Sequence, residues 1–105
     1  MFVAKVTGSM VATQKIDSMV GRKLLVVEPF QIDTETGQSM IGSGRALVAV
    51  DTVGAGEGEF VLITQGSSAR LTPETKNLPV ETVIVGIVDT VHAGTTCVYD
   101  KEQKT

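Results

Sequence analysis

Cysteine and aromatic side chains are scarce in this sequence, and their scarcity excludes several kinds of protein. A single cysteine, Cys97, among 105 residues cannot form an internal disulfide, so cysteine usage gives no sign of secretion. Tryptophan is absent, and the aromatic residues are three phenylalanines and one tyrosine. Single-stranded nucleic acid is commonly bound on platforms of aromatic rings, and so few rings do not predict such a platform.

A strong charge of one sign is also missing. The chain has 9 basic and 12 acidic residues, a net charge of −3, and no basic stripe of the kind that neutralises phosphates. No apolar run approaches the roughly 20 residues of a membrane span. The N-terminal residues Met1–Lys5 already resemble a strand and lack the features of a signal peptide. We therefore expect no nucleic-acid partner, no membrane association and a soluble cytoplasmic protein.

β-Branched residues are abundant by contrast. The sequence has 16 valines, 13 threonines and 6 isoleucines, which together make up a third of the chain. These side chains are stiff at χ1 and fit a pleated surface better than a helix. We therefore predict an all-β fold in a single domain over residues 1–105, with a polar tail over about residues 100–105.

Five main strands are expected between glycine- and proline-rich turn signals. They are predicted over Phe2–Ala12 (with a bend at Gly8), Lys23–Glu28, Arg45–Asp51, Glu59–Thr64 and Thr82–Asp89. Pro29 is expected to stop the second strand. Smaller predicted elements are an exposed loop or hairpin tip over Asp33–Gln38, a short helical turn over Gly66–Leu71 and a short strand over Thr96–Tyr99. Five strands with one short helix predict a small OB-like Greek-key barrel, with a β-sandwich as the alternative.

Several of these strands are apolar on both faces. The clearest runs are Ala46–Val50, Phe60–Ile63 and Val83–Val88. In a small barrel only one face of each strand points to the core, and the sequence lacks helices long enough to cover the other face. The pattern therefore favours an oligomer, in which another subunit covers the second face.

A glycine-rich segment, VAVDTVGAGEGEFVL over residues 48–62, is followed by GSSAR over residues 66–70. In this combination the two segments resemble the signature of the EutN/CcmL family of bacterial microcompartment vertex proteins. The resemblance continues, in order along the chain, at VTG (residues 6–8), VATQK (11–15), GRKLLVV (21–27), PV (79–80) and VGIVD (85–89). It covers nearly the whole chain.

The resemblance implies a structural protein and not an enzyme. Members of the family form homopentamers that close the vertices of a polyhedral shell in the bacterial cytoplasm, beside hexameric shell proteins that tile its facets. Such shells house carbon fixation or the breakdown of small substrates such as ethanolamine and propanediol. The resemblance implies no cofactor, no metal and no catalytic residue.

The glycine-rich loop over residues 54–58 has two interpretations. A dinucleotide-binding loop has the pattern GxGxxG between a strand and a helix, whereas here the third glycine comes one residue early and a strand follows. We favour a tight connection, and the resemblance implies that it lies at the subunit contacts around the fivefold axis. The candidate interface or axial-loop residues are Asp51, Gly54, Ala55, Gly56, Gly58, Glu59, Ser67, Ser68 and Arg70.

Arg70 is expected to pair with a carboxylate, either Asp51 or Asp89, because its guanidinium is suited to bidentate pairing. The GSSAR segment differs from a GxSxG nucleophile motif at its last position. One histidine and one cysteine, His92 and Cys97, cannot supply four protein ligands to zinc from one chain, although two ligands per subunit could bridge the subunits of an oligomer. A ligand- or oligonucleotide-binding OB-type module, and a small hydrolase using Ser68 or Cys97, are the competing hypotheses.

Overall fold

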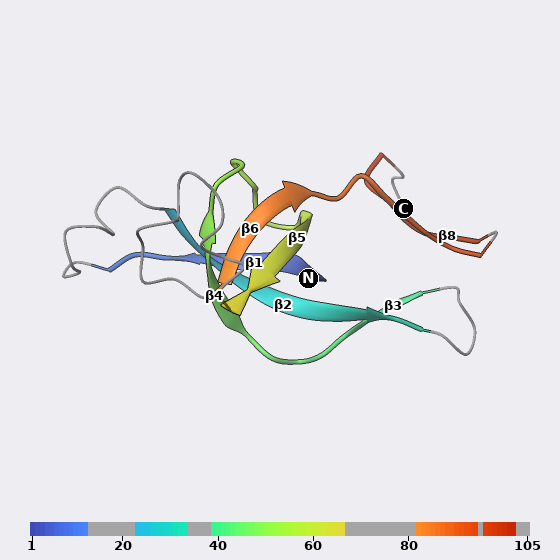
Figure 1. The fold of residues 1–105 in the computed structure, drawn as a ribbon, viewed down its shortest axis with the longest axis horizontal. Helices are drawn as coiled ribbons and strands as arrows, with labels where there is room; N and C mark the ends of the chain where they lie inside the picture. The colour runs from blue at the N-terminus through green and yellow to red at the C-terminus, as the bar shows by residue number, and fades with distance from the viewer. Residues whose placement is uncertain (13–22, 34–38, 67–81, 95, 103–105) are drawn as a thin grey trace.

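Strands account for most of the chain that the structure describes. This computed structural model describes residues 1–12, 23–33, 39–66, 82–94 and 96–102, whose course is drawn in colour in Figure 1. The strands are β1 (Phe2–Met10), β2 (Lys23–Ile32), β3 (Met40–Gly42), β4 (Leu47–Asp51), β5 (Phe60–Gln65), β6 (Thr82–Ile87), β7 (Thr90–Ala93) and β8 (Thr96–Asp100). The predicted all-β fold is confirmed.

Five of the strands close into a barrel. Their order is β1-β5-β6-β4-β2, and β1 also pairs with β2, so the sheet closes on itself. The neighbours are antiparallel except β4 and β6, which run parallel. These two strands become neighbours because β5, which lies between them in sequence, pairs with β1 and β6 on the far side. The predicted five-stranded barrel is confirmed, and the sandwich alternative is wrong.

Pro29 does not stop the second strand, as the sequence had predicted. β2 continues to Ile32, and Pro29 lies opposite Ala4 in the pairing with β1. A proline removes one backbone donor but keeps its acceptor, and the Pro29 carbonyl accepts a hydrogen bond from the Ser43 amide at 3.0 Å. Beyond Pro29, β2 leaves the barrel and pairs with β3 as a hairpin. The predicted loop tip over residues 34–38 lies outside the described residues.

A second hairpin follows the barrel. The single strand predicted over Thr82–Asp89 ends at Ile87, and a new strand, β7, pairs with β8. The strand predicted over Thr96–Tyr99 is confirmed and extends to Asp100. In Figure 1 both hairpins extend toward the same side of the barrel. The predicted helical turn lies outside the described residues beyond Gly66.

The predicted bend at Gly8 is confirmed as an irregularity in β1. The pairing register between β1 and β2 shifts between Val6 and Gly8. An extra residue on one strand of an antiparallel pair increases its local twist and curvature. The bulge therefore helps β1 to pair with β5 at one end and with β2 along its length.

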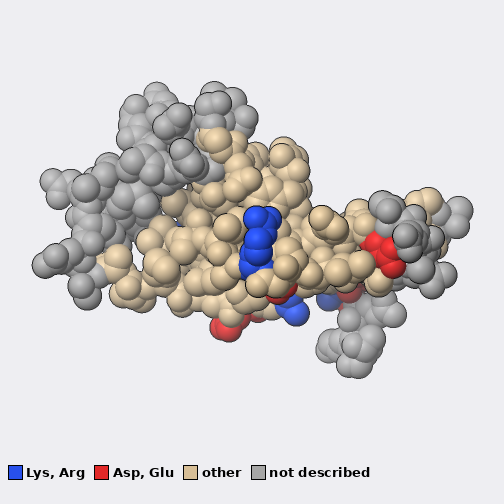
Figure 2. All heavy atoms as spheres, turned by 90° about the horizontal axis from the view of Figure 1, so that it is seen from below, with Lys and Arg blue, Asp and Glu red and all other residues tan. Residues whose placement is uncertain are grey.

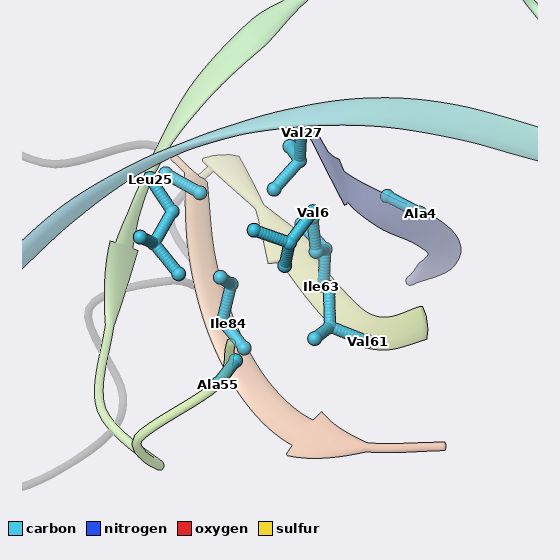
Figure 3. Close-up of a cluster of buried hydrophobic side chains, with 9 residues drawn as sticks. Ala4, Val6, Leu25, Val27, Ala55, Val61, Ile63 and Ile84 are labelled. Carbon is cyan, nitrogen blue, oxygen red and sulfur yellow. The ribbon is translucent and has the colours of Figure 1, made fainter. Parts of the chain in front are cut away.

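Alternating side chains fill the barrel interior. Figure 3 shows this cluster, which consists of Ala4, Val6, Leu25, Val27, Ala49, Ala55, Val61, Ile63 and Ile84. Successive residues of a strand face opposite sides, so every second residue of these strands reaches the core. Burying one Val or Ile side chain contributes about 1.5–3 kcal/mol, which makes this cluster the main source of barrel stability.

A second, smaller apolar cluster lies on the outside of the barrel. Val50 and Val83 are 3% and 0% exposed, although each is adjacent in sequence to an inward-facing residue. The chain itself therefore covers part of the outer face of β4 and β6, and this corrects the expectation that only another subunit could do so. Val48, on the same face of β4, remains 42% exposed.

Candidate functional site

The glycine loop connects β4 to β5 and is tied to the end of β4 by one carboxylate. Asp51 Oδ1 accepts hydrogen bonds from the amides of Val53 and Gly54 at 3.0 and 3.1 Å, and its Oδ2 accepts one from Ala55 at 2.9 Å. Aspartate commonly satisfies the backbone in this way just after a strand, and bonds to an ionised acceptor are the stronger kind. The Asp51 side chain is only 1% exposed, so Asp51 holds the loop from within.

Ala55 closes one end of the barrel. Its side chain is 0% exposed and belongs to the core cluster, where Figure 3 shows it beside Ile84. The Ala55 carbonyl accepts a hydrogen bond from Lys23 Nζ at 3.1 Å, and the same ammonium lies 3.8 Å from Asp51 Oδ2. The side chain of Ala55 thus faces its own subunit, and the proposed contact role falls to the rest of the loop.

Two of the loop glycines adopt a backbone conformation that other residues avoid. The φ angles of Gly54 and Gly58 are +80° and +88°, whereas Gly56 lies outside the positive-φ region. The turn is also bonded to β1, since the Gly58 amide donates to the Val6 carbonyl at 2.8 Å. The requirement for glycine therefore comes from backbone geometry at positions 54 and 58.

Glu59 joins the loop to the end of the chain. Its Oε1 accepts a hydrogen bond from the Gly56 amide at 2.6 Å, and its Oε2 lies 2.8 Å from Lys101 Nζ. The Lys101 ammonium, followed by the Gly56 amide, holds the pKa of Glu59 below its ordinary value, and Glu59 raises the pKa of Lys101 in turn. Glu59 was a predicted site residue, but Lys101 was assigned only to a polar tail.

These bonds also decide against phosphate binding. A phosphate cradle needs several free backbone amides pointing at one place. Here the amides of residues 53, 54 and 55 already bond to Asp51, that of Gly56 bonds to Glu59, and that of Gly58 bonds to Val6. The loop presents carboxylates where a phosphate would need donors.

Of the residues considered for catalysis or metal binding, the structure describes only His92 and Cys97. His92 and Cys97 are cross-strand partners on the β7–β8 hairpin, and both side chains are exposed. Within the described ranges, no group of three or more His, Cys, Asp or Glu side chains is placed to hold a metal ion. Ser67, Ser68 and Arg70 lie outside the described residues. Asp51, one of the two carboxylates predicted for Arg70, bonds to the loop and lies beside Lys23; its predicted pairing with Arg70 stays a prediction.

A broad charged patch is missing from one face of the molecule. Figure 2 shows that most described atoms on this face are uncharged, with a short column of basic atoms near the centre and small separate basic and acidic groups at the lower edge and to the right. In the part of the chain that the structure describes, no helix has the length and apolar character needed to cross a membrane.

Replacing Gly58 with alanine is expected to lower the free energy of unfolding by about 1–2 kcal/mol, because a left-handed backbone costs that much once a Cβ is present. A Cβ at Gly58 would meet no atom within 4 Å, so the change isolates the backbone effect. Gly56→Ala is the matched control and should cost less, although its Cβ would lie 3.3 Å from Glu59 Oε1. Urea denaturation at one protomer concentration measures both variants. Equal losses would contradict the assignment of the backbone requirement to Gly58.

Comparison with known proteins identifies relatives along the whole chain. Residues 1–89 match the family described as ethanolamine utilisation protein EutN/carboxysome. The bacterial microcompartment shell vertex protein PduN of Salmonella typhimurium is 46% identical over 91 residues, which cover 87% of this chain and 98% of PduN. The structure of Gloeobacter violaceus CcmL has a TM-score of 0.86 and 37% identity, covering 98% of this chain and 100% of that chain. The structure of the GrpN pentameric microcompartment shell protein from Rhodospirillum rubrum has a TM-score of 0.72 and 44% identity, covering 89% of this chain and 99% of that chain.

Proposed function

Because this chain belongs to the ethanolamine utilisation protein EutN/carboxysome family, we propose that it is a vertex protein of a bacterial microcompartment shell. The observation that carries the proposal is that the matched residues, 1–89, contain the complete five-stranded barrel. The shell vertex role of PduN and the pentameric state of GrpN support a ring of five copies. A closed surface built from hexagonal units needs pentagons to curve, and such a ring supplies them.

A ring of identical chains closes head to tail, so each subunit uses two different surfaces. We assign one of them to the glycine loop, whose residues Val53, Gly54, Glu57 and Gly58 are exposed. Asp51 and Glu59 already fix this loop within a single chain. Association therefore does not have to order the loop, which lowers the entropic cost of binding.

The other surface is assigned to an outer apolar band on β1, β2 and β4, which consists of Met10, Leu24, Val26 and Val48. Val26 lies opposite Val48, and Leu24 lies opposite Met10 in the strand pairing, so the four side chains share the outer face. Met10 and Val48 are 44% and 42% exposed in the single chain. A neighbouring subunit in the ring would remove this apolar surface from water.

The proposed role is mechanical and involves no chemical step. The pentamer fills an opening among hexameric shell proteins, and those proteins are its proposed partners at the rim of the ring. The shell itself lies in the bacterial cytoplasm. Ser67, Ser68 and Arg70, which follow β5, are kept as proposed contacts within the ring.

Native mass spectrometry at micromolar concentration is expected to give five times the mass of one chain. In cells that lack this protein, electron microscopy should show elongated or unsealed shells, because facets still tile while vertices stay open. The encapsulated enzymes should remain active in lysates of these cells. A monomer, or closed and regular shells without the protein, would overturn the proposal. Cargo turnover that is lost in lysates and restored by this protein alone would instead indicate a catalytic function.

A further inference from the structure

The β7–β8 hairpin is fastened to the barrel at its base. The ring of Tyr99 packs against that of Phe60 with centroids 4.6 Å apart, and Phe60 contacts Phe30 edge-on at 4.9 Å. Just after β8, the Lys101 amide donates a hydrogen bond to the Asp89 carbonyl at 2.8 Å. A two-stranded hairpin is marginally stable by itself in water, so these contacts determine where the residues after β8 lie.

Lys101 is thereby placed beside the glycine loop. Its ammonium lies 2.8 Å from Glu59 Oε2, while the other oxygen of the same carboxylate accepts the Gly56 amide at 2.6 Å. The Glu59 side chain thus bonds both to Lys101, just after β8, and to Gly56, in the middle of the loop. The two parts are far apart in sequence, and Lys101 lies beyond residues 1–89, which match the family.

We propose that the β7–β8 hairpin, through Lys101 just after it, is an electrostatic latch for the glycine loop. The Glu59–Lys101 ion pair holds the loop in the conformation that contacts a neighbouring subunit, and Glu59 and Lys101 are positioning residues. The assignment of the loop to a subunit contact rests on the proposed function, but the latch itself lies within one chain. The Lys101 side chain is 37% exposed and that of Glu59 is 24% exposed. Salt and acid can therefore reach the pair, and releasing it loosens the loop without unfolding the barrel.

The direction of the pH dependence follows from the two groups. The pKa of Glu59 is lowered below 4.5, so its contribution is present above that pH and is lost as the pH falls through the lowered pKa. The pKa of Lys101 is raised above 10.5, so its contribution persists through neutral pH and is lost only in strong alkali. The other charged groups on the elements around the Glu59–Lys101 pair are Lys5, Glu57, Asp89 and Glu102. Of these, Asp89 and Glu102 also raise the pKa of Lys101, though less than Glu59 does. The latch is therefore closed at neutral pH and opens in acid.

The test is amide hydrogen exchange at Gly56, measured on the full-length protein. Lys101→Met should speed this exchange about two- to fivefold, which is the range for an exposed ion pair, and Lys101→Arg should restore slow exchange. Glu59→Ala removes the acceptor itself and should speed it about tenfold or more. Glu102→Gln is the control, because it removes a neighbouring charge outside the Glu59–Lys101 pair, and it should leave the exchange unchanged.

A second readout separates positioning from general stability. In Lys101→Met the acid midpoint of Glu59, followed by carboxyl NMR, should rise toward 4.5, the ordinary value for this group. Unchanged Gly56 exchange and an unchanged midpoint would overturn the latch, while a pentamer in the same sample would leave the vertex function standing. A monomeric wild-type protein with faster Gly56 exchange in Lys101→Met would support the latch and reject the vertex function.

Discussion

Replacing Asp51 with alanine is expected to lower the free energy of unfolding by about 2–4 kcal/mol. The change removes the acceptor of three backbone amides at the end of β4. Water can replace the bonds of the exposed Val53 and Gly54 amides. The Ala55 amide is partly shielded, and the Ala55 side chain is anchored in the core, so most of the loss comes from this bond. Denaturant unfolding at fixed protomer concentration measures the change.

Asp51→Asn is the matched variant for this experiment. An asparagine keeps one carbonyl oxygen, which can turn to accept the bond from the Ala55 amide while the bonds to Val53 and Gly54 are given up to water, so less than half of the loss is expected. Lys23 contributes little to the difference, because its side chain is 56% exposed and lies 3.8 Å from Asp51 Oδ2. An alanine variant as stable as the wild type would mean that the core contact of Ala55 holds the loop without Asp51.

Replacing Val48 with aspartate is expected to abolish the pentamer at micromolar concentration while leaving the barrel folded. Val48 is 42% exposed in the single chain, so a carboxylate there remains hydrated in the monomer. In the proposed ring the same carboxylate would be desolvated without a partner, at a cost of several kcal/mol. A loss of about 4 kcal/mol weakens each contact roughly a thousandfold. Native mass spectrometry detects the loss of the ring.

Val48→Thr serves as the control, since threonine has nearly the same shape and carries no charge. The threonine variant should remain pentameric, with at most a modest shift in the concentration at which it dissociates. Circular dichroism of both variants checks that the barrel is intact. A pentameric aspartate variant would place the outer apolar band outside the subunit contact and would leave the two hairpins as the candidates for the second contact surface.

The number of barrel strands and their approximate positions could be predicted from local features of the chain. β-Branched runs separated by glycine and proline predicted all five barrel strands, because strand preference depends on neighbouring side chains and turn residues. The Gly8 bend and the strand at Thr96 were also predicted. Pro29 misled the prediction, since a proline prevents only one hydrogen bond and β2 does not need that bond there. β7 was missed because Thr90–Ala93 follows the fifth predicted strand directly, with no glycine or proline to separate the two.

The glycine loop could be recognised from sequence, but its internal bonds could not. The motif placed Asp51 and Glu59 on either side of the loop, and the structure brings both carboxylates back onto its backbone. Which glycine needs a positive φ depends on how the turn bonds to Asp51 and to β1, and the constrained positions are Gly54 and Gly58 rather than Gly56. A sequence pattern contains no information about these contacts of the turn.

Contacts between distant parts of the chain were decided by tertiary structure. Lys23 reaches the Ala55 carbonyl across 32 residues of sequence. Lys101 reaches Glu59 because the base of the β7–β8 hairpin packs against Phe60 through Tyr99. Period-two alternation identifies which side chains leave a strand on the same face, and its weakness in Ala46–Val50, Phe60–Ile63 and Val83–Val88 indicated apolar residues on both faces of these strands. It does not reveal which elements become neighbours. The burial of Val83 within its own chain depended on closure of the barrel, and the link between Lys101 and the loop depended on the packing of the β7–β8 hairpin against Phe60.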